Sequence, residues 1–260
     1  MGSNYTEYYV QLINKRTKAP INDDTGLFIV MEASEATLQT IYSDANGTAP
    51  AFVYTNVAST MTDGKIRFWT ASSVTSVDVT FITAAGQAGF IEGLTSSQHR
   101  YEVDTEQYEQ TLILPFYNYI PTPFVSASVT IYTSAGLGSV WSQGMSLPAG
   151  ALVKNCFCRV ETLGTGSLVN FGVSGTPAGL LQQVTGSVTG LKWASGLIAT
   201  GGTVTFGIGT LLQTATTFGG ATPIFITGAT AIVFGEVTGT CLAAREGWVY
   251  IQYDLLPNRV

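Results

Sequence analysis

The sequence predicts an all-β protein made of two antiparallel β-sandwich domains. Apolar and polar residues alternate along short stretches, which is the pattern of strands that bury one face. Residue pairs typical of tight hairpins lie between such stretches. Although 45% of the 260 residues are hydrophobic, the chain shows no convincing apolar stripe with a helical period. Short strands with frequent turns are typical of antiparallel sandwiches.

Three stretches show the strand pattern most clearly, at residues 8–12, 77–81 and 203–208. In the second stretch, the apolar residues 77, 79 and 81 share one face, while Asp78 and Thr80 share the other. We therefore expect half-buried strands at all three places, because successive side chains of a strand point to opposite faces.

Turns are expected at three pairs of residues that tolerate the positive φ values of tight hairpins, namely Asn46-Gly47, Asp63-Gly64 and Gly201-Gly202. The most apolar stretch, residues 222–237, is interrupted by polar residues and a glycine, and it predicts two short strands about a turn. Residues 34–41 are the only candidate helix, with Ser34 as its N-cap, but they suit a strand equally well.

Charge and glycine content divide the chain into two parts. Residues 1–118 hold six basic and thirteen acidic residues, net −7, whereas residues 119–260 hold five basic and four acidic residues, net +1. The second part also holds twenty-two of the 29 glycines. A proline-rich segment at residues 115–124 interrupts any strand ladder and suits a stiff connector. We expect an acidic, Ig-like domain over residues 1–118 and a Gly/Thr-rich, charge-poor, jelly-roll-like domain over residues 119–260.

The low charge of the second part points to a covered surface. Nine charges in 142 residues are few for a solvated domain, so we expect this surface to meet a partner or other copies of the chain. The chain lacks an apolar run long enough for a membrane helix, and its amino terminus lacks the features of a secretory signal. An acidic pI of about 4.7, without a basic cluster, argues against nucleic acid as a partner.

The three cysteines, Cys156, Cys158 and Cys241, are expected to be packed thiols. Cys156 and Cys158 lie two apart on a predicted strand and face the same way, which suits buried thiols better than a disulfide. A zinc site needs about four ligands, and three thiols with one histidine show no finger-like spacing. We therefore expect neither a metal nor a cofactor. Free thiols are consistent with synthesis in a reducing cytoplasm.

No catalytic triad is expected around the only histidine. His99 and Asp104 lie on opposite faces of a predicted strand, so the carboxylate could orient the imidazole only across a sharp bend. The chain also has no G-x-S-x-G motif. We therefore expect a surface or strand-end histidine.

The acidic pairs do not predict an active site either. Asp23 with Asp24, and Glu106 with Glu109, could flank a glycosidic bond, but both pairs lie in polar segments and are expected to be solvated. Residues 44–47 resemble part of a calcium loop that lacks its later acidic ligands. The chain has no phosphate-binding loop and no dinucleotide fingerprint. The sequence therefore predicts a protein that is not an enzyme, with no catalytic, cofactor-binding or metal-binding residues.

Several segments resemble β-sandwich domains of tailed-bacteriophage virion proteins. In the first part, a YxDxxG…DGxixFW pattern followed by a VDVxI-like strand matches residues 40–48, 62–69 and 76–81. In the second part, the resemblance to another recurrent virion β-domain lies in residues 146–151, 170–173 and 247–253. Together these segments are spread over most of the chain.

The resemblance implies a structural protein of the virion, most like a head decoration (cement) protein. Such a protein binds the major capsid protein and itself, as a dimer or trimer, and stabilises the capsid from its surface after synthesis in the host cytoplasm. It would bind neither nucleic acid nor membrane. The alternative is a receptor- or carbohydrate-binding module of a fibre or other appendage, for which the candidates are Trp69, Trp141, Trp193 and Trp248.

Overall fold

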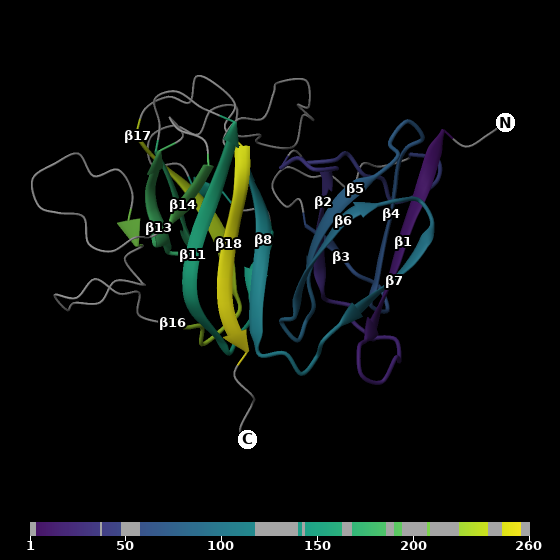
Figure 1. Cartoon of the computed structure of the whole chain (residues 1–260), viewed down its shortest axis with the longest axis horizontal. Helices are drawn as coiled ribbons and strands as arrows, with labels where there is room; N and C mark the ends of the chain where they lie inside the picture. Colours follow the sequence, from purple (N-terminus) through teal and green to yellow (C-terminus); the bar gives the residue numbers. More distant parts are fainter. Residues whose placement is uncertain are drawn as a thin grey trace, which may run out of the picture.

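The computed structural model describes residues 4–36, 38–47, 58–117, 140–141, 144–162, 168–185, 190–193, 207–208, 224–238 and 246–255. These residues form strands and turns without a helix, so the all-β prediction is confirmed for the part of the chain that the structure describes. The strands form four sheets, and Figure 1 shows them as two groups side by side.

The first group, at the right of Figure 1, contains two sheets. The β1 sheet has the order β4-β1-β7, with bounds Lys65–Ala71, Tyr5–Asn14 and Gln98–Val103. Its central strand pairs antiparallel with β4 and parallel with β7, which is a departure from the expected antiparallel pattern. The β5 sheet has the antiparallel order β3-β2-β5-β6, with bounds Ser59–Thr60, Leu27–Glu32, Val77–Ile82 and Ala88–Leu94.

An apolar core joins the β1 sheet to the β5 sheet. The predicted apolar faces of the two central strands are buried in one cluster, which includes Tyr8, Val10, Leu12, Val77, Val79 and Phe81. The rings of Tyr8 and Phe68 stack in this core with centroids 5.2 Å apart. Each large side chain buried here stabilises the fold by about 1.5–3 kcal/mol. The alternation of residues therefore predicted correctly which faces of these strands meet.

The second group also contains two sheets. The β18 sheet has the order β14-β11-β18-β8, with bounds Gly190–Trp193, Ala151–Thr162, Glu246–Leu255 and Glu109–Tyr117, and β16 (Ile224–Phe225) also pairs with β11. The β12 sheet has the order β10-β17-β12-β13-β15, with bounds Ser146–Leu147, Thr230–Thr238, Leu168–Val173, Thr176–Thr185 and Gly207–Ile208. β9 (Val140–Trp141) pairs with β17.

The core of the second group holds the two thiols that the sequence predicts to be buried. Cys156 and Cys158 are fully buried and free, in one cluster with residues of β8, β12 and β18. Phe116 meets Phe171 edge to face in this core, with ring centroids 5.1 Å apart. Cys241 lies outside the described residues. The expectation of packed thiols is therefore confirmed for Cys156 and Cys158.

The prediction that β5 is half-buried is wrong. All six of its residues are buried, including Asp78 and Thr80 on the face that the sequence assigns to the polar side. Asp78 accepts hydrogen bonds from the main-chain N–H groups of Ser34 (2.8 Å) and Gly93 (2.7 Å). Apolar and polar residues alternate in the same way whether the carboxylate is solvated or is buried and bound by N–H groups of other segments. The sequence pattern therefore could not reveal that Asp78 is buried.

Three other segments, at residues 34–41, 222–237 and 201–208, carry local predictions. Ser34 does not begin a helix: it lies in a turn with φ +65°, and Leu38 forms an isolated bridge with Met31. Residues 222–237 do contain two strands, β16 and β17, but these join different sheets and are not a hairpin. The strand expected at 203–208 is described only for β15, and the Gly201-Gly202 turn lies outside the described residues.

The two groups of sheets share one apolar cluster and several polar contacts. Ile29, Met31 and Ile82 of the β5 sheet belong to the same core cluster as the second group. The buried Tyr253 hydroxyl donates a hydrogen bond to the Gly86 carbonyl (2.6 Å). Burial raises the pKa of this hydroxyl far above its ordinary value. β18 is therefore tied to the loop between β5 and β6.

β8 lies before the predicted domain boundary but joins the second group. It pairs antiparallel with β18 from Glu109 to Tyr117. Residues 118–124 of the proline-rich connector lie outside the described residues. The division at residue 118 stays a prediction, as do the Ig-like and jelly-roll-like architectures.

Candidate functional site

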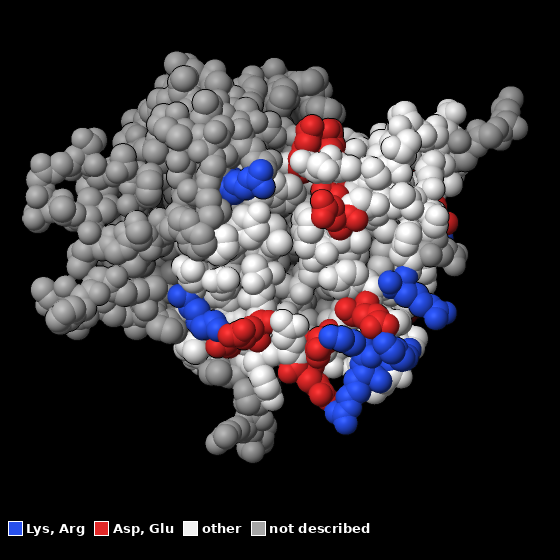
Figure 2. All heavy atoms as spheres, viewed as in Figure 1, with Lys and Arg blue, Asp and Glu red and all other residues white. Residues whose placement is uncertain are grey.

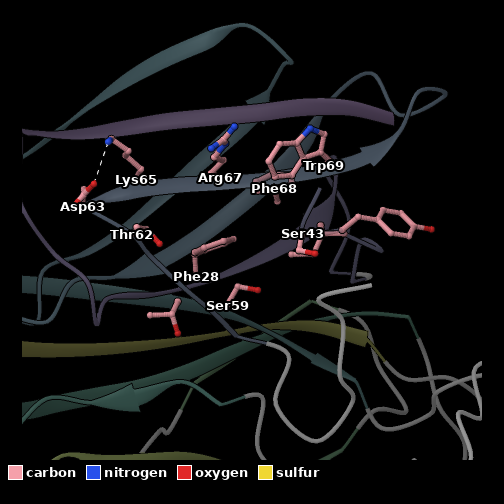
Figure 3. Close-up of a pocket in the computed structure, with 12 residues that line it drawn as sticks. Phe28, Ser43, Ser59, Thr62, Asp63, Lys65, Arg67, Phe68 and Trp69 are labelled. Atoms are coloured by element: carbon pink, nitrogen blue, oxygen red, sulfur yellow. Dashed lines mark hydrogen bonds and ion pairs between the residues drawn. The ribbon is translucent and has the colours of Figure 1, made fainter. Parts of the chain in front are cut away.

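A slot of about 420 Å³ lies between the outer edges of β4 and β3, the edge strands of their sheets, and we call it the edge slot. Figure 3 shows its lining, with residues of β4 along one side and Ser59 of β3 on the other. The buried rings of Phe28 and Phe68 form part of its wall. Its volume falls in the range of about 300–1,000 Å³ that is typical of small-molecule sites.

A tight turn at Asp63-Gly64 forms one end of the slot. Both residues have positive φ values, 52° and 64°, so the predicted turn is confirmed. A Cβ atom at position 64 would lie 1.8 Å from the Ile21 carbonyl oxygen, and only glycine fits there. The turn directs the chain into β4, whose residues then alternate between the core and the outer face.

The main chain of Arg67 faces the slot. Leu12 N–H donates to the Gly64 carbonyl, so even-numbered residues of β4 direct their main-chain groups toward β1, and odd-numbered residues direct them toward the free edge. On that edge, Lys65 exchanges hydrogen bonds with Thr62, and Trp69 exchanges them with Tyr42. The N–H and C=O of Arg67, between these bridges, have no hydrogen-bond partner among the described residues.

Each charged side chain that lines the slot has an oppositely charged neighbour. Arg67 donates to Glu7 (2.6 Å), and its guanidinium lies 4.8 Å from the centroid of the Trp69 ring. Lys65 lies 3.4 Å from Asp63. The slot therefore presents no net charge, and the guanidinium holds the indole ring in place.

Four hydroxyl groups complete the lining, on Ser43, Ser59, Thr60 and Thr62. In the part of the chain that the structure describes, none of these side-chain hydroxyls has a hydrogen-bond partner. The slot therefore combines an aromatic ring, neutral donors and acceptors, and one open main-chain N–H and C=O pair. Of these groups, the sequence marks only Trp69, because it does not show which edge of a strand stays unpaired.

A second feature is the outer face of the β18 sheet, which is aromatic and mostly uncharged. The rings of Phe157 and Tyr250 stack here with centroids 4.8 Å apart, beside the Asn155–Gln252 side-chain hydrogen bond of 3.2 Å. Figure 2 shows a largely uncharged band over β11, β18 and β8. We call it the neutral face.

Charged residues border the neutral face at its ends. Lys154 pairs with Asp254 (2.8 Å) and Glu109 (2.9 Å), and these hydrogen bonds raise the pKa of its ammonium group. Arg159 lies near the other end of β11, on the same side of the sheet as Phe157. The outer face is therefore neutral between two charged margins.

The structure keeps His99 and Asp104 apart. His99 Nε2 lies 3.2 Å from the Thr95 hydroxyl, whereas Asp104 pairs with Lys15 at 3.4 Å. On β7, Tyr101 and Val103 are at least half-buried while Glu102 is exposed, which confirms the predicted alternation of faces. These residues therefore do not assemble into a triad.

The expectation of solvated acidic pairs is wrong for Asp23. Its buried carboxylate accepts hydrogen bonds from the N–H groups of Thr25 (2.9 Å), Gly26 (2.7 Å) and Ala84 (2.7 Å). Asp24 is exposed and accepts from Asp63 N–H at 2.7 Å. The first pair therefore holds loops together, because loop N–H groups replace water around the buried carboxylate.

The second acidic pair is exposed, as expected. Glu106 forms an ion pair with Arg16, and Glu109 with Lys154. Each carboxylate thus has a separate cationic partner, and neither pair has the arrangement of two acids flanking a bond.

The other sequence candidates form no site among the described residues. Gly47 has φ +66° and donates to the Asp44 carbonyl, so residues 44–47 form a turn. No group of three potential metal ligands occurs in the described ranges. Burial raises the pKa of the Cys156 thiol, with a smaller contribution from Cys158. A thiol with a raised pKa is a poor nucleophile near neutral pH.

The four tryptophans differ in their surroundings. Trp69 lines the edge slot and is half-buried. Trp248 is buried and meets Phe90 edge to face at 5.6 Å. Trp141 and Trp193 lie on β9 and β14, and their side chains lie outside the described part of the structure. Among the described tryptophan side chains, Trp69 is therefore the one positioned to contact a ligand.

No family model, curated protein or solved structure matches the chain. The described residues include no helix that is long and apolar enough to span a membrane.

Proposed function

We propose that this chain is a structural protein of a tailed-bacteriophage particle, a head decoration protein that binds the major capsid protein and stabilises the capsid. The observation that carries this proposal is the neutral face. Its stacked rings and paired amides offer a preformed surface that can lie against another protein without removing charges from water. Removing water from the margins would cost more, since they carry the ion pairs.

The surroundings of the candidate reactive groups support a binding role. His99 lies beside the Thr95 hydroxyl, and Glu106 is in an ion pair with Arg16. Asp23 holds loop N–H groups, and the two described thiols are buried in the core. A protein that binds the assembled shell better than free capsid subunits favours the assembled state by mass action. This mechanism needs a rigid surface and no chemistry.

A charge placed on the neutral face tests the proposal. Gln252→Lys is expected to lower the occupancy of the protein on capsids at least about tenfold, because the ammonium would lose its water on binding. Gln11→Lys is the matched control, since Gln11 lies half-buried in β1 on the other group of sheets. Occupancy is counted in electron-microscopy maps of capsids mixed with each variant. Equal occupancy of Gln252→Lys and wild type would argue against the neutral face as the contact.

The edge slot favours a second candidate, a receptor- or carbohydrate-binding appendage module. Particles that lack a decoration protein should assemble but lose their genome at lower temperature. Particles that lack an appendage should remain robust but fail to adsorb to host cells. Copies spread over the capsid lattice support decoration, whereas a few copies at one vertex support the appendage.

A further inference from the structure

We propose that the edge slot binds a neutral glycan, with Trp69 as its apolar contact surface. The inference does not depend on the decoration proposal, because the slot lies in the first group of sheets and the neutral face lies in the second. Three properties of the slot support it, and they concern its main chain, its charge and its aromatic ring.

The open main-chain pair of Arg67 suits a hydroxyl group. The N–H donor and the C=O acceptor of Arg67 both point to the outer edge of β4, and a sugar hydroxyl can donate and accept at once. The bridges of Thr62 to Lys65 and of Tyr42 to Trp69 occupy the neighbouring edge positions. An added peptide strand would need those positions, so the opening suits a compact polar ligand better than strand addition.

The pairing of charges selects against an ionic ligand. An anionic sugar would compete with Glu7 for Arg67 and meet the carboxylate of Asp63, while a cationic ligand would meet Lys65. The four hydroxyls, which have no partner among the described residues, instead offer neutral donors and acceptors. The chemistry of the slot therefore matches a ligand rich in hydroxyl groups and without charge.

Trp69 supplies the apolar part of the contact. Its half-buried ring is held by the Arg67 guanidinium and by the hydrogen bonds of its main chain to Tyr42. A ring fixed before binding loses little conformational freedom when it meets the C–H face of a sugar. An aromatic surface surrounded by a small number of precisely placed polar groups is typical of small-molecule sites.

The full-length protein is to be tested on an array of neutral and acidic oligosaccharides, and the affinity for the best neutral sugar is then measured by NMR titration. Trp69→Ala is expected to weaken this binding at least about tenfold. Thr60→Val, which removes one hydroxyl at nearly constant volume, should weaken it about threefold. Tyr108→Ala, which removes a ring that is 57% exposed and outside the slot, should leave binding unchanged.

Any one of three results would overturn the proposal that the edge slot binds a neutral glycan. The first is no binding to any neutral sugar, and the second is tighter binding to acidic sugars than to their neutral analogues. The third is that the single variants Thr60→Val and Trp69→Phe both bind the neutral sugar as tightly as wild type does. The last two variants keep the test valid if Trp69→Ala does not fold. Capsid occupancy of Trp69→Ala and sugar affinity of Gln252→Lys should both match wild type, so failure of this inference is distinguishable from failure of the decoration proposal.

Discussion

The two groups of sheets differ in whether buried carboxylates help to satisfy their main chains. In the first group, the buried carboxylate of Asp23 accepts hydrogen bonds from the N–H groups of Gly26 and Ala84, and that of Asp78 from the N–H groups of Ser34 and of Gly93 in β6. In the described loops of the second group, main-chain groups bond to one another, as where Gly150 N–H donates to Ile226 and Ile226 N–H to Ala151, each at 2.8 Å. Main-chain pairing holds loops in both groups, as where Gly64 N–H donates to Asp23 and Met61 N–H to Gly26 in the first. Among the described residues, buried carboxylates add to this pairing in the first group.

This difference explains part of the charge asymmetry of the chain. Two of the acidic residues before residue 119 are structural, because a buried carboxylate bound by N–H groups stabilises the loops that supply them. In the described loops of the second group, main-chain bonds meet this requirement without a buried carboxylate.

The largest expected effect concerns β8 and tests where the two groups divide. A fragment of residues 105–260 keeps Leu112, Leu114 and Phe116, each fully buried, whereas a fragment of residues 119–260 loses them. At about 2 kcal/mol for each side chain, the shorter fragment should lose roughly 6 kcal/mol of stability and unfold without a cooperative transition. Urea denaturation followed by circular dichroism compares the two. The same transition midpoint in both fragments would show that β8 is not required by the second group.

The next effect distinguishes a structural from a solvated carboxylate. Asp23→Ala should lower the free energy of unfolding by about 3–4 kcal/mol, since three N–H groups lose a charged acceptor. Asp24→Ala, the matched control, removes one exposed acceptor and should cost about 1 kcal/mol. Chemical denaturation of both variants provides the measurement. Similar losses for the two would mean that the loops do not depend on the buried carboxylate.

A smaller effect concerns the contact between the groups at Tyr253. Tyr253→Phe removes the buried hydrogen bond to Gly86 and should cost about 1–2 kcal/mol at neutral pH. Tyr108→Phe, at an exposed position, should cost nothing measurable. Denaturation midpoints at pH 7 compare the two variants.

The same hydroxyl contributes to the loss of stability at high pH. Because its pKa is raised in the folded state, its contribution is present below the ordinary tyrosine pKa of about 10 and is lost as the pH rises above that value. Wild type should therefore lose stability more steeply above pH 10 than Tyr253→Phe. The variant keeps the alkaline loss due to Tyr8 and Cys156, whose pKa values burial also raises. Parallel curves for the two proteins would contradict the assignment.

The smallest effect concerns the surface ion pairs of the first group. Lys18 and Glu102 lie 2.6 Å apart, but their side chains are 60% and 46% exposed. Lys18→Ala should change the free energy of unfolding by less than about 0.5 kcal/mol and become indistinguishable from wild type at 1 M salt. A loss above about 1 kcal/mol would indicate that this pair acts as a network with the ion pairs of Lys15 with Asp104 and of Arg16 with Glu106.

The local pattern of residues predicted the local features of the fold. Alternation identified the faces of β1 and β5 that meet in the first core, the Asp63-Gly64 pair identified a turn, and spacing identified two thiols on one buried face. Each of these properties depends on residues close together in the chain. The candidate site was predicted only through Trp69.

What the sequence determined by itself is the all-β class, the faces of individual strands and the uneven charge, because these depend on side-chain period and composition. Tertiary structure decided that Asp78 is buried, that β8 pairs with β18, and that the main chain of Arg67, at a sheet edge, has no partner among the described residues. The reason is that each of these depends on segments far apart in the chain. A polar residue satisfied by distant N–H groups, and a strand edge with or without a neighbour, have the same local sequence pattern.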